Sequence, residues 1–326
     1  MNHPRKILVA PLDWGLGHAS RCVPLIQRHL DAGDEVVVAT KGATQAFLQS
    51  RFPQVRILPL RGYGIQYSKH LPLLLKLLLQ LPRFFFAIRN EHQWLQALLE
   101  NEHFNQIISD NRYGLWSKKT HCVLITHQLS PALPSGLKIM RGMINRILAK
   151  MINRFDECWI PDVEGDQSIS GDLSTGNSLV KNQQYIGWLS RFQNNGLKSN
   201  LAAQPVYEHV VLISGPEPHR SLMEKQMTEE ALASGVSTII FSGKPLEQSM
   251  ITTGSLTIVP NASDDLIQYH LNHAKKITCR SGYSTLMDLA VLGLKAEIIP
   301  TPGQTEQEYL AERMCKGRGW KIKQKD

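Results

Sequence analysis

The sequence TCRSGYSTLMD, residues 278–288, marks a change from strand to helix. Residues 276–279 are apolar or β-branched after the first lysine, as at the end of a buried strand, and the Ser-Gly pair at 281–282 permits a tight turn. The run 285–292 has helical spacing and ends at Gly293, which is suited to the C-terminal cap of a helix. The segment therefore predicts a strand–turn–helix unit of an α/β fold.

This strand-to-helix turn offers binding groups for an anion. The first amide groups of a helix have no partners within it, and the positive end of the helix dipole lies there. Arg280 adds a permanent cation whose forked geometry matches phosphate, and Gly282, Ser284 and Thr285 lie at the junction. Asp288 follows one turn later, where a carboxylate can accept hydrogen bonds from sugar hydroxyls. We predict a site for a nucleotide diphosphate; the alternative is an ordinary turn that binds nothing.

The composition is that of a globular protein with a basic excess. The chain has 326 residues, of which 42% are hydrophobic, so it can form two domains of ordinary size. The net charge of +8 favours anionic partners. Nucleic acid is not expected among them, because the basic residues are dispersed and lack interleaved aromatic residues. Five scattered cysteines and the absence of a recognisable signal peptide indicate a cytoplasmic protein without a disulfide framework or zinc site.

The first half begins with a predicted strand, helix and strand at residues 7–10, 22–30 and 35–40. The intervening loop contains Gly15-Leu16-Gly17-His18 but lacks the third glycine of a dinucleotide fingerprint. No acidic residue for a ribose ends the second strand, so a Rossmann dehydrogenase is not expected.

The same loop supplies candidates for a general base. Asp13 and His18 lie at the carboxyl end of a strand, where open α/β sheets bind ligands. The alternative for His18 is a solvated turn residue. Predicted strands at 106–110 and 123–126 lead into Asp110 and His127, which share this edge of the sheet if the strands are parallel.

The polar region after residue 163 predicts a domain boundary, because it is rich in Gly, Ser, Asn and Gln. Residues 145–155 are expected to be helical, and 157–162 to form the last strand of the first half. We predict an N-terminal domain over 1–163, a linker over 164–204 with a bridging strand at 184–188, and a C-terminal domain over 205–326.

Residues 71–88 are unusually apolar, with a length close to that of a membrane span. Lys76, Gln80 and Arg83 interrupt the run and two prolines are expected to break the helix, so we predict that it does not span a bilayer. It forms either core helices or a partly exposed apolar face, flanked by basic residues, that rests on an anionic membrane.

Strand–helix alternation restarts in the second half, with strands expected at 209–213, 237–241, 256–260 and 276–279 and a helix at 266–273. Three of these strands end in Ser-Gly, at 214–215, 242–243 and 281–282. Small residues at strand ends leave room for a ligand. Two similar α/β halves predict a cleft between two sheet edges.

The second half resembles the nucleotide-sugar site of family 28 glycosyltransferases, in particular the MurG-type N-acetylglucosaminyltransferases. The first half is similar to the same family in its Gly-Leu-Gly-His loop and in Thr126-His127-Gln128 with the following helix. The residues of the second half that carry the resemblance are Cys279, Arg280, Ser281, Gly282, Thr285, Asp288, Ala290, Gly293, Pro300, Gln307 and Tyr309.

The resemblance implies the GT-B fold, two Rossmann-like domains with the donor nucleotide on the second and the acceptor on the first. Asp288 would hold the ribose, Gln307 the donor sugar, and His18 would lie near the reacting centre. Gly15, Gly17 and His127 would line the acceptor side. The groups expected on the diphosphate side are Ser214, Gly215, Arg280, Ser281, Gly282, Ser284 and Thr285.

The sequence departs from the family pattern at several of these places. Asp288 stands where the family usually has Glu, and Asp13-Trp14 replaces Gly-Thr in the first loop. The second glycine loop carries prolines at 216 and 218, which remove backbone donors. These departures leave the acceptor open, whether a sugar or a lipid-linked molecule of the cell envelope.

The predicted reaction is inverting transfer of a hexosyl group to a hydroxyl from a nucleoside diphosphate sugar, which the resemblance implies to be UDP-linked. His18, Asp13 and Asp110 are the candidate bases. No cofactor is expected, and no metal, because no Asp-x-Asp motif stands at a strand end. The protein would act in the cytoplasm or at the inner face of the plasma membrane. The alternatives are a nucleotide-sugar hydrolase or epimerase on the same scaffold, and a binding protein without catalysis.

Overall fold

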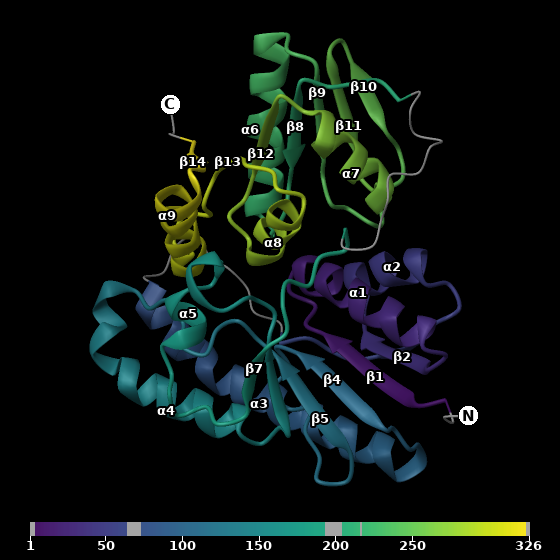
Figure 1. The fold of residues 1–326 in the computed structure, drawn as a ribbon, viewed down its shortest axis with the longest axis vertical. Coiled ribbons are helices and arrows are strands. Elements are labelled where there is room, and N and C mark those ends of the chain that lie inside the picture. Colours follow the sequence, from purple (N-terminus) through teal and green to yellow (C-terminus); the bar gives the residue numbers. More distant parts are fainter. Residues whose placement is uncertain (1–3, 64–72, 193–203, 216, 324–326) are drawn as a thin grey trace. The chain divides into compact units, whose positions relative to one another are not determined.

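The computed structural model describes residues 4–63, 73–192, 204–215 and 217–323, and the side chains of 73–81 are outside this description. The chain divides into two compact units, Met1–Trp14 with Cys22–Trp188 and Gly15–Arg21 with Leu189–Asp326. Each unit contains an open sheet flanked by helices (Figure 1). The α/β class predicted from the strand–helix alternation is confirmed.

The first sheet contains, within the described residues, seven parallel strands in the order β3-β2-β1-β4-β5-β6-β7. Its central strands are buried on both faces, which explains their continuous apolar runs. The strands are β1 (Lys6–Pro11), β2 (Glu35–Thr40), β3 (Arg56–Pro59), β4 (Gln106–Asp110), β5 (His121–Ile125), β6 (Glu157–Ile160) and β7 (Gln183–Tyr185).

Helices cover both faces of this sheet (Figure 1). Ile88 and Leu95 of α3 and Ile152 of α4 pack in one core cluster with Leu8 and Ile107 of the sheet. The helices of this half are α1 (Gly17–Asp31), α2 (Gly42–Arg51), α3 (Leu73–Asn101), α4 (Arg141–Ile152) and α5 (Asp172–Thr175), with 3-10 turns η1 (Ser135–Met140) and η2 (Gly165–Gln167).

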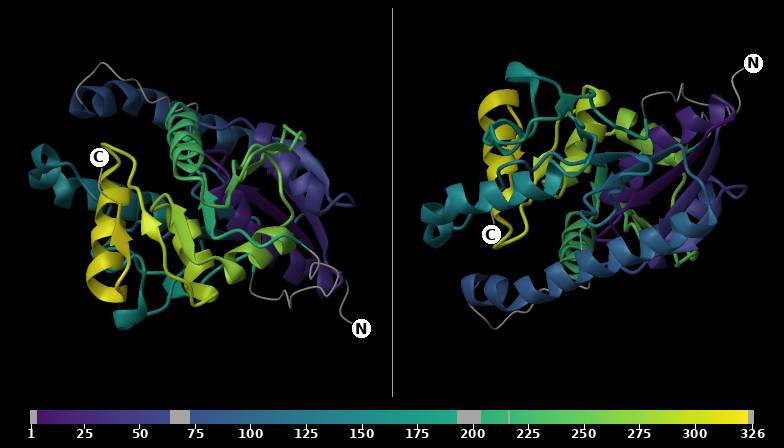
Figure 2. Two further views of the ribbon diagram at one scale, coloured as in Figure 1. Left: turned by 90° about the horizontal axis from the view of Figure 1, so that it is seen from above. Right: turned by 90° about the horizontal axis from the view of Figure 1, so that it is seen from below.

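The expectation that prolines break the helix in the apolar segment is wrong at Pro82. Helix α3 continues through this residue as one long helix (Figure 2). A proline removes one amide donor and disturbs one turn, and the remaining turns of this helix pack on the sheet through residues such as Ile88 and Leu95. Residues 71 and 72 lie outside the described part of the chain.

The strand at 157–162 is not the last of its sheet. β7 pairs in parallel with β6, so the segment predicted to bridge the domains adds a further strand to the first sheet. Its three residues, Gln-Gln-Tyr, are polar because they form an exposed edge. The first compact unit accordingly extends to Trp188, into the stretch predicted as a linker.

The second sheet contains seven strands among the described residues, in the order β10-β11-β9-β8-β12-β13-β14. All pairs are parallel except β10 with β11. The strands are β8 (His209–Leu212), β9 (Thr238–Phe241), β10 (Ile251–Thr253), β11 (Leu256–Val259), β12 (Lys276–Cys279), β13 (Glu297–Ile298) and β14 (Lys321–Ile322), and the helices are α6 (His219–Ser234), α7 (Asp264–His273), α8 (Tyr283–Val291) and α9 (Thr305–Arg318).

The strand–turn–helix unit predicted around residue 282 is present. β12 leads through Arg280, Ser281 and Gly282 into α8, and Gly293 follows the helix with φ +69°. A positive φ is rarely adopted by residues with a side chain, which is why glycine ends this helix. Because β8 lies between β9 and β12, the three strands that end in Ser-Gly are neighbours in the sheet.

Candidate functional site

Small residues gather where β9, β8 and β12 end. Gly215 and Gly243 adopt φ values of +100° and +63°, which favour glycine. A Cβ atom added to Gly282 would lie 3.9 Å from the Ser214 hydroxyl oxygen, so Ser214 and Gly282 are close together across the strand ends. The structure thus brings together three residues predicted on the donor side, Ser214, Gly215 and Gly282.

The N-terminus of α8 opens at this edge. Gly282 is its N-cap residue in extended conformation, and no side chain caps the helix. Ser284 and Thr285, in the first turn, are both half-buried. The amide groups of this turn, with the helix dipole behind them, have the character of an anion site.

Arg280 is a buried cation at the same edge, with only 5% of its surface exposed. Its Nη1 donates to the carbonyls of Ile299 and Pro300 at 3.3 and 3.4 Å, and its Nη2 to the carbonyl of His219 at 3.0 Å. Nε is buried without a hydrogen-bond partner. Burial lowers the pKa of Arg280 to about 10, and no carboxylate of the described residues forms an ion pair with it. A buried cation without a carboxylate partner is suited to binding an anion.

Ser281 and Gln307 have structural partners. The Ser281 hydroxyl donates to the carbonyl of Gln307 at 2.7 Å, which ties β12 to α9. The side-chain oxygen of Gln307 accepts from the amide of Thr301 at 2.9 Å, and its nitrogen donates to Gln304 at 2.6 Å. Both side chains therefore shape the loop beside the strand end; their contacts with a diphosphate and a donor sugar remain predictions.

Asp288 is buried and also has partners within the protein. Its Oδ1 accepts from the Ser190 hydroxyl at 2.6 Å and its Oδ2 from Arg191 Nε at 3.2 Å. Arg191 Nη1 reaches Asp264 at 3.1 Å. Burial raises the pKa of Asp288, and the charge of Arg191 and the Ser190 hydrogen bond oppose that rise. Sequence reasoning missed Ser190 and Arg191, which lie in the polar stretch without a motif around them.

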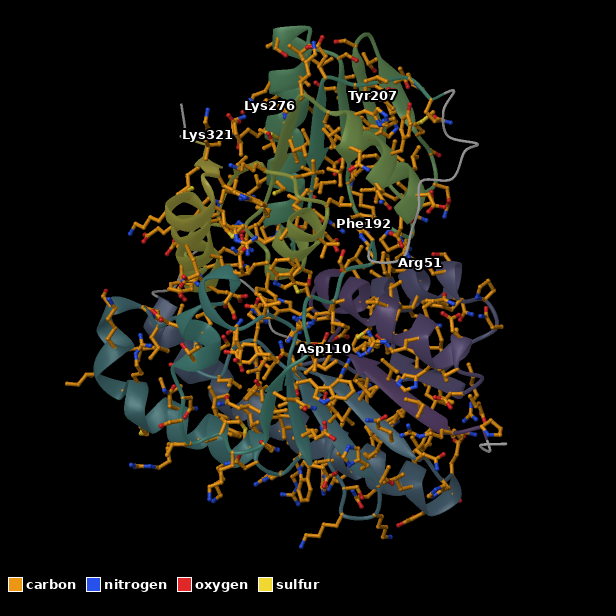
Figure 3. All side chains as sticks on the ribbon, viewed as in Figure 1. Arg51, Asp110, Phe192, Tyr207, Lys276 and Lys321 are labelled. Atoms are coloured by element: carbon orange, nitrogen blue, oxygen red, sulfur yellow. The ribbon has the colours of Figure 1, made fainter. Side chains whose placement is uncertain are left out.

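The polar residues predicted at the edge of the first sheet come from three neighbouring strands. The register pairs the last residue of β1 with Asp110 and Asp110 with the last residue of β5, so Asp13, Asp110 and His127 follow adjacent strand ends. Figure 3 labels Asp110 at the end of β4. Asp110 is fully buried, with the Cys22 sulfur 3.8 Å from Oδ2, and His127 is 3% exposed. Of the carboxylates proposed as bases, Asp13 retains solvent access, with 18% of its side chain exposed.

The first glycine loop belongs by its contacts to the second compact unit. Gly15 has φ +78°, and the carbonyl of Gly17 accepts a hydrogen bond from the Ser284 hydroxyl at 2.8 Å. His18 Nδ1 lies 2.8 Å from Nη2 of Arg21. A guanidinium only donates hydrogen bonds, so Nδ1 is the acceptor and neutral His18 carries its hydrogen on Nε2.

Two further polar residues at the second sheet's edge were not predicted. Arg220 donates from Nη1 to the carbonyl of Gly243 at 3.0 Å and pairs with Glu217 at 2.6 Å. The Ser242 hydroxyl is buried without a hydrogen-bond partner. The repeated Ser-Gly pairs are a signal that points to Ser242, whereas nothing in the local sequence distinguishes Arg220. No group of His, Cys, Asp and Glu suited to a metal ion occurs in the described part of the chain.

Comparison with known proteins gives one curated relative and many similar structures. No protein-family model matches the sequence. The chain is 24% identical over 328 aligned positions to a Methanosarcina acetivorans protein described as an uncharacterized glycosyltransferase, covering 93% of this chain and 81% of the relative.

Among the similar solved structures are two determined with UDP or a UDP-sugar and one described as a forosaminyltransferase. Arabidopsis thaliana UGT89C1 with UDP-L-rhamnose has a TM-score of 0.60 at 13% identity, covering 99% of this chain and 85% of that one. LpCGTa with UDP has a TM-score of 0.57 at 14% identity, covering 96% and 83%. The spinosyn forosaminyltransferase SpnP has a TM-score of 0.55 at 15% identity, covering 96% and 84%. The chain has the α/β fold of these GT-B enzymes, as expected from the sequence.

Proposed function

We propose that this protein is a glycosyltransferase that moves a hexosyl group from a nucleoside diphosphate sugar, UDP-linked, to an acceptor hydroxyl with inversion and without a metal. The observation that carries the proposal is the buried Arg280 guanidinium, which has no carboxylate partner among the described residues and lies next to the uncapped N-terminus of α8. The glycosyltransferase relative and the UDP-bound structural neighbours support the same ligand class.

Arg280 and the α8 amides act on the leaving group. As the bond between the sugar C1 and the diphosphate oxygen breaks, negative charge accumulates on the diphosphate. A cation already held by three main-chain carbonyls, together with oriented amide groups, stabilises this charge without reorganisation. These groups supply the charge neutralisation that a metal ion provides in other transferases. Ser214, which follows β8, and Thr285, in the first turn of α8, add hydroxyls at the same edge.

The acceptor is proposed to bind at the edge of the first sheet, beside Asp13 and His127, and to be a sugar or a lipid-linked molecule of the cell envelope, as in MurG-type enzymes. Exposed apolar residues support a partner at an anionic membrane surface. Phe85 and Phe86 of α3 are 46% and 65% exposed, and Arg83 and Arg89 beside them are also exposed. Among the described residues no helix has the length and apolarity needed to cross a bilayer.

The test is a thermal-shift and calorimetry panel of UDP, ADP, GDP and dTDP with the sugar derivatives of each. A ligand that binds only the folded protein raises its apparent stability. We expect UDP and a UDP-sugar to raise the melting temperature of the parent and to lose this effect in Arg280→Met. Lys316→Ala, which removes an exposed cation of the same half, is the matched control. Binding of none of the diphosphates would contradict the proposal.

A further inference from the structure

Arg112 lies fully buried behind the end of β1 and has no access to solvent. Its Nε donates to the carbonyl of Pro11 at 2.9 Å, and its Nη1 to the carbonyl of Arg61 at 3.0 Å and to Glu91 Oε1 at 2.7 Å. These contacts fix the plane of the guanidinium. Its Nη2 is left 3.6 Å from Oδ1 of Asp13, within ion-pair distance. Nη2 is buried and has no hydrogen-bond partner.

A second layer of contacts fixes Glu91. This carboxylate, 3% exposed, accepts from the Tyr63 hydroxyl at 2.9 Å and from the amide of Gly114 at 3.3 Å. The Tyr63 oxygen in turn accepts from the amide of Tyr113 at 2.9 Å. Burial raises the pKa of Glu91, and the charge of Arg112 opposes the rise. The arginine that faces Asp13 is therefore held by a network of buried groups.

Gly62 lies directly against the Asp13 carboxylate. A Cβ atom added there would lie 1.7 Å from Oδ1, which no pair of real atoms allows. Its φ is not in the left-handed region, so glycine is required at this position for space. Arg112 and Gly62 together determine where the carboxylate of Asp13 lies, while 18% of that side chain stays exposed.

His18 is a second candidate for the general base. Its Nδ1 accepts a hydrogen bond from Arg21. To take a proton at Nε2, the neutral ring would first need its hydrogen on Nδ1, which would then face the N–H group of Arg21. In this arrangement His18 offers an N–H donor at Nε2. Asp110 is fully buried. Among the three candidate bases, Asp13 therefore has the carboxylate oxygen that is both exposed to solvent and able to accept a proton.

We infer that Asp13 is the general base of the transfer reaction and that Arg112 is its positioning residue, an assignment that rests on the proposed function. The Asp13 carboxylate takes the proton of the acceptor hydroxyl as that oxygen forms a bond to C1 of the donor sugar. The bond from C1 to the diphosphate oxygen breaks, and the electron pair leaves with the diphosphate. Asp13 then releases its proton to solvent.

The test compares six variants with the parent: Asp13→Asn, His18→Asn, Gly62→Ala, Arg112→Gln, Arg112→Lys and Asp166→Asn, the last removing an exposed carboxylate of the same half as a control. UDP release from UDP-glucose and UDP-N-acetylglucosamine is followed with water and with added alcohols as acceptors. UDP affinity is measured separately by calorimetry. Melting temperatures verify that each variant is folded.

We expect Asp13→Asn to lower kcat about 100- to 10,000-fold, with UDP affinity unchanged, and to abolish the fall in rate at acid pH that protonation of a carboxylate base causes. Gly62→Ala should lower kcat without changing any charge and with UDP affinity and melting temperature kept, whereas the disturbance of a merely structural Asp13 would appear as a lower melting temperature. Arg112→Lys should restore part of the activity lost in Arg112→Gln, since it keeps the positive charge.

Other results overturn the assignment. If Asp13→Asn keeps the parental kcat and pH profile, or if His18→Asn alone abolishes the acid limb, Asp13 is not the base, and the glycosyltransferase proposal stands. If the parent binds UDP but releases it from neither UDP-sugar with any acceptor, the transfer reaction is contradicted and the base with it. If the parent binds no nucleoside diphosphate, the donor site itself fails.

Discussion

The Nε atom of Arg191 donates a hydrogen bond to Oδ2 of Asp288 at 3.2 Å, joining two residues 97 positions apart. Arg191 simultaneously contacts Asp264 at 3.1 Å, so one guanidinium bridges the first turn of α7 and the second turn of α8. Both ends of the pair are largely withdrawn from solvent, with 14% of the Arg191 side chain and 6% of the Asp288 side chain exposed. Asp288 therefore contributes to the fold of the second half, whatever it contributes to a ligand.

Replacing Asp288 by Asn should lower the free energy of unfolding by about 3 kcal/mol, because breaking a buried pair leaves the other charge poorly compensated. Urea denaturation measures this, with Glu229→Gln on the exposed face of α6 as the control. A loss no larger than the control's would show that the pair adds nothing to stability.

The ribose contact of Asp288 needs its own measurement. If the carboxylate also accepts from the ribose, the parent should bind UDP more tightly than 2′-deoxy-UDP, by about ten- to 150-fold for one charge-assisted hydrogen bond. Asp288→Asn should remove that preference. Equal affinity of the parent for both nucleotides would rule out a contact with the 2′-hydroxyl.

Replacing Arg280 by Met should weaken UDP binding about ten- to 100-fold, because a charge-assisted contact in a dry site is lost. Arg280→Lys keeps the charge without the forked geometry and should fall between parent and Met variant. Isothermal calorimetry supplies both constants. Parental UDP affinity in Arg280→Met would place the diphosphate elsewhere.

Acid should destabilise the protein through His270. This side chain is 2% exposed, and burial lowers its pKa to about 4. The unfolded chain therefore binds more protons than the folded one between about pH 6.5 and pH 4, so stability is complete above this window and is lost as the pH falls through it. One such histidine accounts for about 2 kcal/mol between pH 7 and pH 5.

His270→Phe tests this, since the ring contacts Tyr207, Phe241 and Tyr269 and an aromatic replacement suits the cluster. Unfolding free energies measured in urea at pH 7 and pH 5 should differ less in the variant than in the parent. An unchanged difference would mean that other groups cause the acid sensitivity.

The exposed phenylalanines of α3 should mediate binding to anionic vesicles. We expect the parent to co-sediment with vesicles that contain phosphatidylglycerol, to be released by salt, and to bind neutral vesicles weakly. The double change Phe85→Ser and Phe86→Ser should reduce binding, whereas Leu246→Ser, at a 73% exposed position of the second half, should not. Absence of binding by the parent at low salt would leave α3 as a core helix alone.

Patterns within about fifteen residues predicted most of the fold. The apolar runs of β1, β2, β4 and β12 are recognisable because each strand is buried on both faces. Short edge strands such as β7 and β14 have no such run, since a strand with one open side needs no continuous apolar sequence. The prediction that Pro82 breaks the helix was wrong because the free energy lost at one turn is smaller than the free energy gained by packing along the rest of α3.

Those site residues that lie next to a recognisable strand end or helix start in the sequence could be predicted. Arg280 and Gly282 adjoin a strand end and a helix start, and both features are visible in the sequence. Arg112 could not be singled out, because its importance comes from Pro11, Arg61 and Glu91, which are brought to it only by the fold. For the same reason the partners of Asp288 had no sequence signal.

The three oxygens that hold Arg280 are all main-chain carbonyls, at 219, 299 and 300. Substitutions at these three positions therefore leave the acceptors of the guanidinium in place, because each acceptor belongs to the main chain. Side chains at positions 219, 299 and 300 can change during evolution without turning the charge of Arg280, as long as the backbone conformation is retained.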